Sequence, residues 1–461
     1  MYCLTRHYFL NNIVCILLHP VAYIELYYFK RCDLFLIIHV VKSGESLYEI
    51  SKLYGASYTK IALDNELTNP ADLVVGQTIV ILQGTRPHKI ISGQSLYSIS
   101  KMYGVTIASL YSTNPSLNVS TLLYPGQIIN IPPSQGKIGS IEANGYALPS
   151  TNMDVLVKTL PSLTYLSIFS YQVLANGSLK GINDIPLITA ARKAKVAPMM
   201  VITNLKEGGG FDSDLASTLL TDETVQNKLL DNIISTLKSK NYYGLDIDLE
   251  YIYPKDREKY NNFIRKTVAR LKPLGYTVTT ALAPKPSGDI KGLLYEAHDY
   301  PVHGATVSHV ILMTYEWGYT SGPAMAVAPI NNVKKILDYA VTVIPSKKIF
   351  MGIPNYGYDW TLPFEPGTKA VALGNVEAVT LARRVNASIQ YDYTAQAPFF
   401  NYYASNGRKH VVWFEDARSI NVKLRTASEY NLGGVSYWTI GKYFPQNWLV
   451  QNSLFDIKKL L

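Results

Sequence analysis

The chain has 461 residues, of which 48% are hydrophobic and 17% charged, so it is long enough for several folded domains and too apolar to be disordered. The net charge of +9 favours an anionic matrix, but no arginine-rich stripe or nucleic-acid motif accompanies it, and we expect no nucleic-acid partner. All three cysteines precede residue 33, which excludes disulfides and cysteine nucleophiles from the rest of the chain.

The N-terminal segment, residues 1–37, fits no standard targeting signal. Apolar residues dominate from Asn11 to Phe29, but His19, Pro20 and Glu25 interrupt the run. A signal peptide needs an unbroken apolar core, and a membrane-spanning helix needs about 20 apolar residues. We interpret the segment as an uncleaved extension of unclear role, with a membrane anchor as the alternative, and we expect no firm membrane association.

One motif occurs twice in the first third of the chain. Residues 41–55 read VKSGESLYEISKLYG, and residues 90–104 read IISGQSLYSISKMYG. Each copy continues through an asparagine, Asn65 or Asn114, to a Gly-Gln pair and an apolar strand. In each copy a serine can cap the following helix, apolar residues at helical spacing bury one face, and a glycine ends the helix. The repeat predicts two small β-α-α-β units.

These units resemble the LysM domain, a module that binds N-acetylglucosamine chains of peptidoglycan and chitin, over residues 38–82 and 88–132. The resemblance implies a glycan groove between the first strand–helix loop and the second helix–strand loop, which spans 73–76 or 123–126. The implied glycan-binding residues are Gly44, Glu45, Ser46 and Gly76 in the first unit and Gly93, Gln94, Ser95 and Gly126 in the second. The alternative is that these residues serve only as caps and turn formers.

A linker, residues 133–139, leads to a long domain over residues 140–461 in which buried strands alternate with helices. The predicted strands span residues 143–147, 163–169, 197–203, 244–250, 277–283, 309–314, 348–353 and 434–438. Eight such strands separated by helices indicate an α/β fold, a (β/α)8 TIM barrel. The gap before the last strand predicts an α+β insertion at about 360–430.

The fourth predicted strand carries the most informative stretch, residues 243–250, which read YGLDIDLE. Side chains alternate along a strand, so Asp246, Asp248 and Glu250 share one face, pointing into the barrel and rising toward its C-terminal rim. We expect coupling among the three carboxyl groups to raise at least one pKa and to keep a proton for acid catalysis. A divalent-metal site or structural hydrogen bonds are the alternatives, but no metal-ligand spacing accompanies the stretch, and we expect no metal or other cofactor.

This stretch resembles the signature of glycoside hydrolase family 18, D-x-x-D-x-D-x-E. The resemblance implies that Glu250 is the catalytic acid and base, that Asp248 orients the substrate's acetamido group, and that Asp246 supports it. The first Asp of the pattern is Tyr243 here, a departure at a supporting position.

Other family positions fall at other strand ends. Residues 313–316, MTYE, resemble the family's M-x-Y-D, which implies that Tyr315 binds the acetamido oxygen and that Met313 and Glu316 contribute to substrate binding. Trp438 matches the tryptophan that forms the floor of the sugar-distorting subsite. The third strand departs from the family, since Thr203–Leu205 stands where S-x-G-G is usual.

The resemblance implies substrate-assisted retaining hydrolysis, in which the acetamido oxygen replaces an enzyme nucleophile. Two LysM units joined to such a barrel resemble the spore cortex-lytic N-acetylglucosaminidases. We therefore predict a monomeric enzyme that binds and cleaves peptidoglycan or another N-acetylglucosamine polymer, in the bacterial spore or at the cell wall. The alternatives are a chitinase acting on chitin oligomers and a non-catalytic carbohydrate-binding coat protein.

Overall fold

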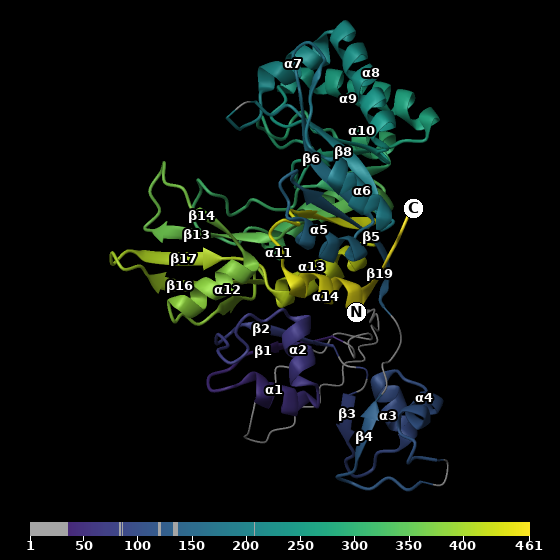
Figure 1. Cartoon of the computed structure of the whole chain (residues 1–461), viewed down its shortest axis with the longest axis vertical. Coiled ribbons are helices and arrows are strands. Elements are labelled where there is room, and N and C mark those ends of the chain that lie inside the picture. The colour runs from purple at the N-terminus through teal and green to yellow at the C-terminus, as the bar shows by residue number, and fades with distance from the viewer. Residues whose placement is uncertain (1–35, 83, 85, 119–120, 132–136, 207) are drawn as a thin grey trace, which may run out of the picture.

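The computed structural model describes residues 36–82, 84, 86–118, 121–131, 137–206 and 208–461. The predicted extension, residues 1–37, therefore lies almost wholly outside the described residues. Within the ranges just given, no helix combines the length and the apolar character that crossing a membrane requires. Figure 1 shows two small N-terminal modules, a barrel of strands and helices, and a smaller sheet beside the barrel.

The first module, residues 36–82, has the predicted β-α-α-β fold. Its elements are β1 (Leu36–Val40), α1 (Leu47–Tyr54), α2 (Tyr58–Asp64) and β2 (Thr78–Leu82), and β1 pairs with β2 in antiparallel fashion. Helix α1 begins at Ser46, whose hydroxyl accepts the Glu49 N–H while the Glu49 side chain accepts the Ser46 N–H. It ends at Gly55, which takes the left-handed conformation that favours glycine.

The second module, residues 86–131, repeats this fold. Its elements are β3 (Arg86–Lys89), α3 (Leu96–Tyr103), α4 (Ile107–Thr113) and β4 (Ile128–Ile131), with β3 antiparallel to β4. Ser95 caps α3 together with Ser98, and Gly104 ends it. Each module buries its own small apolar core, around Leu47 and Ile50 in the first and around Ile99 and Leu110 in the second.

Eight parallel strands close into a barrel. They are β5 (Gly139–Ala147), β6 (Tyr165–Val173), β8 (Ala197–Thr203), β9 (Gly244–Asp248), β10 (Thr277–Leu282), β11 (His309–Leu312), β12 (Ile349–Pro354) and β18 (Gly434–Trp438). Strand β5 pairs with both β6 and β18, which closes the ring. The predicted TIM barrel is confirmed, and each predicted strand overlaps one of these. Two short strands extend the sheet, β7 (Leu179–Lys180) on β6 and β19 (Phe455–Ile457) on β5.

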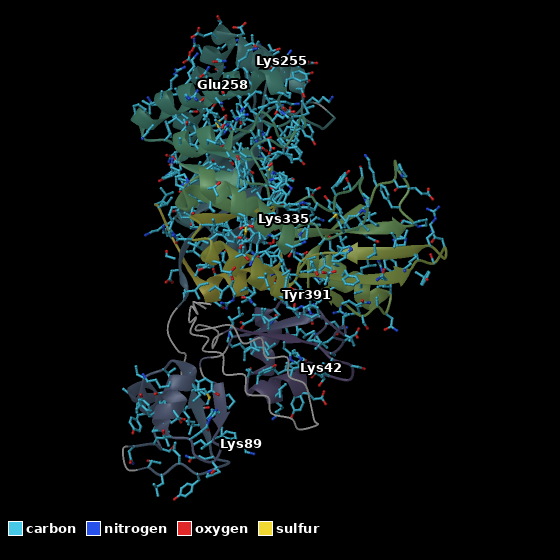
Figure 2. The ribbon with its side chains drawn as sticks, turned by 180° about the vertical axis from the view of Figure 1, so that it is seen from behind. Lys42, Lys89, Lys255, Glu258, Lys335 and Tyr391 are labelled. Atoms are coloured by element: carbon cyan, nitrogen blue, oxygen red, sulfur yellow. The ribbon has the colours of Figure 1, made fainter. Side chains whose placement is uncertain are left out.

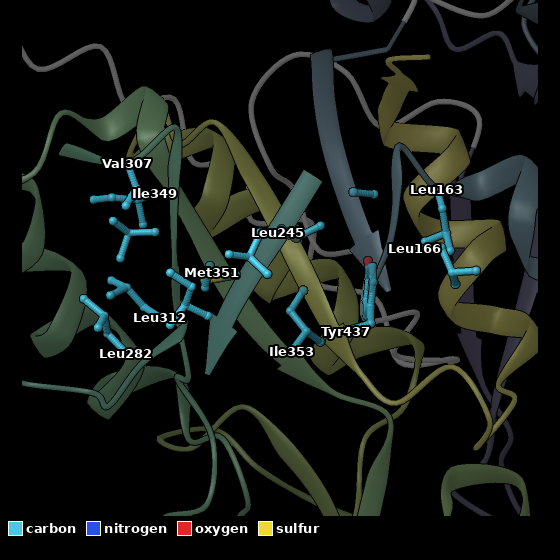
Figure 3. Close-up of a cluster of buried hydrophobic side chains, with 14 of the residues drawn as sticks. Leu163, Leu166, Leu245, Leu282, Val307, Leu312, Ile349, Met351, Ile353 and Tyr437 are labelled. Atoms are coloured by element: carbon cyan, nitrogen blue, oxygen red, sulfur yellow. The ribbon is translucent and has the colours of Figure 1, made fainter. Parts of the chain in front are cut away.

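Helices cover the outside of the barrel (Figure 1). They are α5 (Met153–Thr159), α6 (Ile185–Lys193), α7 (Ser213–Thr221), α8 (Glu223–Lys240), α9 (Arg257–Leu271), α10 (Tyr300–Thr306), α11 (Ile330–Val343), α13 (Ala417–Glu429) and α14 (Pro445–Leu454). The outward side chains of the strands and the apolar faces of these helices form the main core, as Figure 3 shows for Leu245, Leu312, Met351 and Ile353. A separate cluster that includes Phe350 contains inward-pointing strand residues.

The insertion between β12 and β18 is a five-stranded antiparallel sheet with one helix. Its elements are β13 (Tyr356–Leu362), β14 (Val371–Gly374), α12 (Asn375–Arg384), β15 (Gln390–Asp392), β16 (Ala397–Tyr403) and β17 (Lys409–Trp413). The insertion was predicted at about 360–430, and its sheet spans residues 356–413. The sheet begins at Tyr356, and α13 belongs to the barrel because Ile420 and Leu424 pack in the main core. An amphipathic pattern alone does not say which sheet a helix covers.

Candidate active site

Strand β9 presents its side chains as the alternation predicts. Leu245 and Ile247 pack outward in the main core, whereas Asp246 is fully buried inside the barrel and Asp248 is only 5% exposed. Glu250 lies two residues beyond Asp248, the last residue of the strand, so it reaches the C-terminal rim and is partly exposed there. The three carboxyl groups therefore rise from the barrel interior to its mouth.

Asp246 lies deepest and accepts hydrogen bonds from three hydroxyl groups. Tyr146 Oη donates at 2.6 Å, Thr279 Oγ1 at 2.8 Å and Ser167 Oγ at 3.3 Å. Burial raises the pKa of Asp246, and the three donors oppose that rise because they favour the carboxylate. Tyr146, Ser167 and Thr279 come from three other barrel strands, and the sequence did not identify them.

Asp248 has an oxygen without a partner. Its Oδ1 is buried and accepts no hydrogen bond within the described structure. Burial raises the pKa of Asp248 well above its usual value, and the neighbouring Glu250 and Asp246 raise it further. A buried polar atom left unpaired costs stability, so the position makes physical sense if a ligand supplies the missing donor.

Glu250 titrates near neutrality. Burial raises the pKa of Glu250 to about 7, and the negative charge of Glu316 contributes to the rise. In a substantial fraction of molecules the Glu250 carboxyl group is therefore protonated near neutral pH, as a general acid requires. The predicted upward shift of a pKa is confirmed, although burial is its main cause and charge repulsion is secondary.

Asn204, directly after β8, holds the backbone of Glu250 from both sides. Its Oδ1 accepts the Glu250 N–H at 3.0 Å, and its Nδ2 donates to the Glu250 carbonyl at 2.9 Å. The same Nδ2 donates to the Asp212 carbonyl at 3.0 Å. Asn204 is fully buried, so this two-point contact is shielded from water. Asn204 lies in the stretch where the sequence departs from the family pattern. That departure was the sequence feature that could have pointed to this residue.

His298 fixes the residue before Glu250. Its Nδ1 accepts the Ala283 N–H at 2.8 Å, so its Nε2 carries the hydrogen and donates to the Leu249 carbonyl at 3.1 Å. Burial lowers the pKa of His298 to about 4, which keeps this neutral tautomer at physiological pH. Two buried side chains thus fix the backbone on which Glu250 stands.

Residues 313–316 follow β11 and bring the insertion into the site. Glu316 has a positive φ of 65°, and its Oε1 accepts hydrogen bonds from the hydroxyls of Tyr356 and Tyr358 on β13. Burial and the nearby carboxylates raise the pKa of Tyr315, so its hydroxyl stays protonated and can donate. Tyr356 and Tyr358 were missed because sequence alone does not show that the insertion folds back to the rim.

Aromatic rings surround the end of β18. The Trp438 ring meets Phe169 edge-on at 4.8 Å and Tyr146 at 5.3 Å between ring centres. Met313 and Tyr243 are also partly buried in this inner cluster, Tyr243 at 6.2 Å from Tyr165. A tyrosine thus fills the place of the family's first Asp by packing rather than by charge. In the described part of the chain, no three His, Cys, Asp or Glu side chains are arranged to hold a metal ion.

The predicted glycan-binding loops of the two modules are built alike. Glu45 Oε2 lies 2.8 Å from both His39 Nε2 and the Lys42 N–H, and Gln94 Oε1 makes the equivalent contacts with His88 and Ile91. Ser46 and Ser95 cap their helices, and Gly44 and Gly93 have positive φ. The module loops differ at Gly76, which lies against Ile389 of the insertion, and Gly126, which has open space around it.

Comparison with known proteins agrees with this geometry. Residues 152–442 match the glycosyl hydrolases family 18, and residues 39–82 and 88–132 match the LysM domain. The chain belongs to glycosyl hydrolase family 18. It is therefore a glycoside hydrolase, and the two kinds of domain together imply binding to polymers that contain N-acetylglucosamine.

Several relatives match this chain over nearly its whole length and nearly their own. The cortical fragment-lytic enzymes of Bacillus anthracis and Bacillus subtilis (strain 168) are 43% and 44% identical to this chain, each over 92% of it and 99% of their own length. The crystal structure of the spore cortex-lytic enzyme SleL of Bacillus megaterium QM B1551 is similar with a TM-score of 0.86, 39% identity, and coverage of 93% of this chain and 100% of that one. A chitinase from Chromobacterium violaceum shares the fold, with a TM-score of 0.64 and 24% identity.

Proposed function

We propose that this chain cleaves N-acetylglucosaminyl bonds in spore-cortex peptidoglycan by substrate-assisted retaining catalysis. The substrate class rests on the relatives, which include enzymes named for lysis of cortical fragments and span nearly the same length. The same similarity supports a location in the bacterial spore. The mechanism rests on the geometry of Asp246, Asp248 and Glu250.

The observation that carries the mechanism is the pairing of a partnerless acceptor with a proton donor. Asp248 offers the buried Oδ1, and Glu250, two residues along the chain, has a pKa raised to about 7. An acetamido N–H is a donor that can satisfy Asp248 Oδ1, and this contact would turn the acetamido oxygen toward the anomeric carbon. Glu250 is then left to protonate the oxygen of the leaving sugar.

The reaction proceeds in two steps with one carboxyl group exchanging the proton. First, the acetamido oxygen bonds to the anomeric carbon while the glycosidic C–O bond breaks and Glu250 protonates the leaving oxygen. Second, Glu250, now ionised, takes a proton from water, and the water oxygen attacks the anomeric carbon and releases the acetamido group. Two inversions give net retention, and no enzyme nucleophile is required.

The remaining residues orient the sugar. Tyr315, kept protonated, donates to the acetamido oxygen, and Asp246 supports Asp248 from below while its own charge is held by three hydroxyls. The Trp438 ring, packed against Phe169 and Tyr146, forms the floor under the sugar. Met313 and Glu316 border the same subsite, and the N-terminal LysM region binds the glycan chain.

Digestion of purified cortex fragments, with the products reduced and identified by mass spectrometry, tests the proposal. We expect new reducing ends at N-acetylglucosamine and none with Glu250→Gln. A thiazoline mimic of the cyclic intermediate should inhibit competitively. Cleavage of chitin oligomers but not of cortex would refute the substrate, and a covalent glycosyl adduct trapped on Asp246 or Asp248 would refute the mechanism.

A further inference from the structure

The two LysM modules present their equivalent faces to different surroundings. On β2, Ile79 and Ile81 point into the module's own core, so Thr78 and Val80 point outward, and yet both are buried. The equivalent residues of β4 are Ile128, which is 65% exposed, and Asn130, which is also exposed. Something therefore covers the outer face of the first module and not that of the second.

The covering surface is the catalytic domain. Val80 belongs to the main core of the barrel and its helices, and Leu36, Ile38 and Leu82 pack against that core from the same face of the β1–β2 sheet. Strand β2 contacts α13 and α14, and α2 contacts α14. In Figure 1 the first module lies directly against these helices, whereas the second stands clear of the barrel.

Buried polar contacts fix the position of the first module. Gln446, at the start of α14, accepts a hydrogen bond from Thr78 Oγ1 at 2.8 Å and donates to the Thr78 carbonyl at 2.7 Å and to Asn65 Oδ1 at 2.9 Å. Glu66 accepts hydrogen bonds from Lys158 at 2.8 Å and from Tyr443 at 3.1 Å. Buried amide groups with matched partners specify one arrangement rather than a loose contact.

The insertion closes one wall of the first module's predicted glycan groove, residues 73–76. The Val75 carbonyl accepts the Ile389 N–H at 2.9 Å, and a Cβ added to Gly76 would stand 1.9 Å from the Ile389 carbonyl oxygen. Val74 is buried in the apolar core of the insertion, and Arg383 Nε donates to the Asp72 carbonyl at 2.9 Å. A sugar chain cannot occupy space that the insertion already fills.

The same wall is open in the second module. Tyr124 stands at the position equivalent to Val74 and is 63% exposed, and nothing lies within 4 Å of a Cβ added to Gly126. An exposed tyrosine offers a flat apolar face and a polar tip, which together suit a pyranose ring with its C–H face and hydroxyl edge. Figure 2 agrees with this contrast, since Tyr391 of the insertion lies beside the first module while Lys89 of the second lies apart.

We propose that the first module is a fixed part of the hydrolase and that the second alone binds glycan, with Tyr124 as its sugar-contacting ring. The proposal deepens the glycan binding stated under the proposed function and rests on it. One repeat has become structural, and the other keeps the open groove.

Matched substitutions in the full chain test this division. Ser43 and Ser92 occupy equivalent exposed positions on the first walls of the two modules, so a tryptophan at either place obstructs one groove only. Ser43→Trp, Ser92→Trp, Tyr124→Ala and Tyr124→Phe would each be made in a Glu250→Gln background, so that the glycan is not cut. Binding to insoluble peptidoglycan sacculi is measured by co-sedimentation, and thermal unfolding checks that each variant is folded.

We expect Ser92→Trp and Tyr124→Ala to weaken sacculus binding by about tenfold, equivalent to about 1.4 kcal/mol. Ser43→Trp and Tyr124→Phe should bind as the parent does. Equal loss with Ser43→Trp and Ser92→Trp would overturn the division of roles, and unchanged binding with Tyr124→Ala would overturn the role of that ring. If the Glu250→Gln parent itself failed to bind sacculi, the glycan binding stated under the proposed function would be wrong as well. That outcome differs from failure of the division of roles alone, in which the parent binds but the variants do not differ as expected.

Discussion

The first LysM module buries the outer face of its β1–β2 sheet against the barrel, whereas the second leaves the same face of β3–β4 exposed. The two share a capping serine, a terminal glycine and a loop built on a histidine contact. Their difference lies at outward positions, Val80 against Asn130 and Val74 against Tyr124. A shared motif therefore defines a shared fold, and the residues outside the motif decide whether the module becomes part of a larger core.

A substitution on the docked face should give the largest difference between the modules. Val80→Asp places an unpaired charge in the main core and should cost about 3–5 kcal/mol of unfolding free energy, the scale for an uncompensated buried charge. Asn130→Asp, at the equivalent exposed position, should change that free energy by less than about 0.5 kcal/mol. Denaturant unfolding, followed by the tryptophan fluorescence of the catalytic domain, measures the unfolding free energy of both variants. Equal effects would mean that the first module is not docked.

Loss of the catalytic proton should separate chemistry from attachment. Glu250→Gln keeps the shape of the side chain but cannot deliver a proton, so turnover should fall at least about 10²-fold. Sacculus binding should be unaffected, because the second module, which we propose binds the glycan, stands clear of the barrel (Figure 1). Turnover near the parent's value on N-acetylated glycan would remove Glu250 from its assigned role.

Removing the two hydrogen bonds between Asn204 and the Glu250 backbone should have a smaller effect, and that effect should fall on turnover. Asn204→Ala removes both hydrogen bonds to the Glu250 backbone and should lower kcat about tenfold, since small displacements of a catalytic group are costly. KM should change little, because Asn204 bonds the Glu250 backbone and its fully buried side chain is not placed to bind the sugar. A change confined to KM would show that Asn204 binds substrate instead of positioning the acid.

The smallest effect should be a shift in pH dependence. Glu250 must be protonated to act, and its pKa is raised to about 7, so kcat/KM should fall as the pH rises through that value. Glu316→Gln removes a negative charge that raises this pKa, and the alkaline limb should move to lower pH. A pH series of kcat/KM for the parent enzyme and for Glu316→Gln tests this shift. An alkaline limb that stayed in place or moved to higher pH would exclude Glu316 as an influence on the pKa of Glu250.

The barrel, the modules and the carboxylate strand were predictable because each follows from local pattern. Alternation along residues 244–250 fixed the inward face, and the repeat fixed the β-α-α-β unit. The partners of Asp246 were not predictable, because Tyr146, Ser167 and Thr279 become neighbours only when the barrel closes. The contact of Tyr356 with Glu316 depends likewise on how the insertion folds back.

The docking of the first module left one trace in the sequence. Its second strand, TIVIL, has apolar residues on both faces, which is typical of a strand buried on both sides. The second module's strand, IINI, includes Asn130 on its outer face. The pattern indicates that β2 has a second covering surface but cannot identify α13 and α14 as that surface.

Hydrogen exchange of the intact chain, followed by mass spectrometry, tests most directly whether the first module belongs to the catalytic body. Amides within a cooperative unit share its opening free energy. We expect β1 and β2 to exchange with the barrel core, as slowly as β9 and β18, and we expect β3 and β4 to exchange faster, as a separate unit. If β1 and β2 exchanged together with β3 and β4, and faster than the barrel, the two modules would form one independent attachment arm and the account would be wrong.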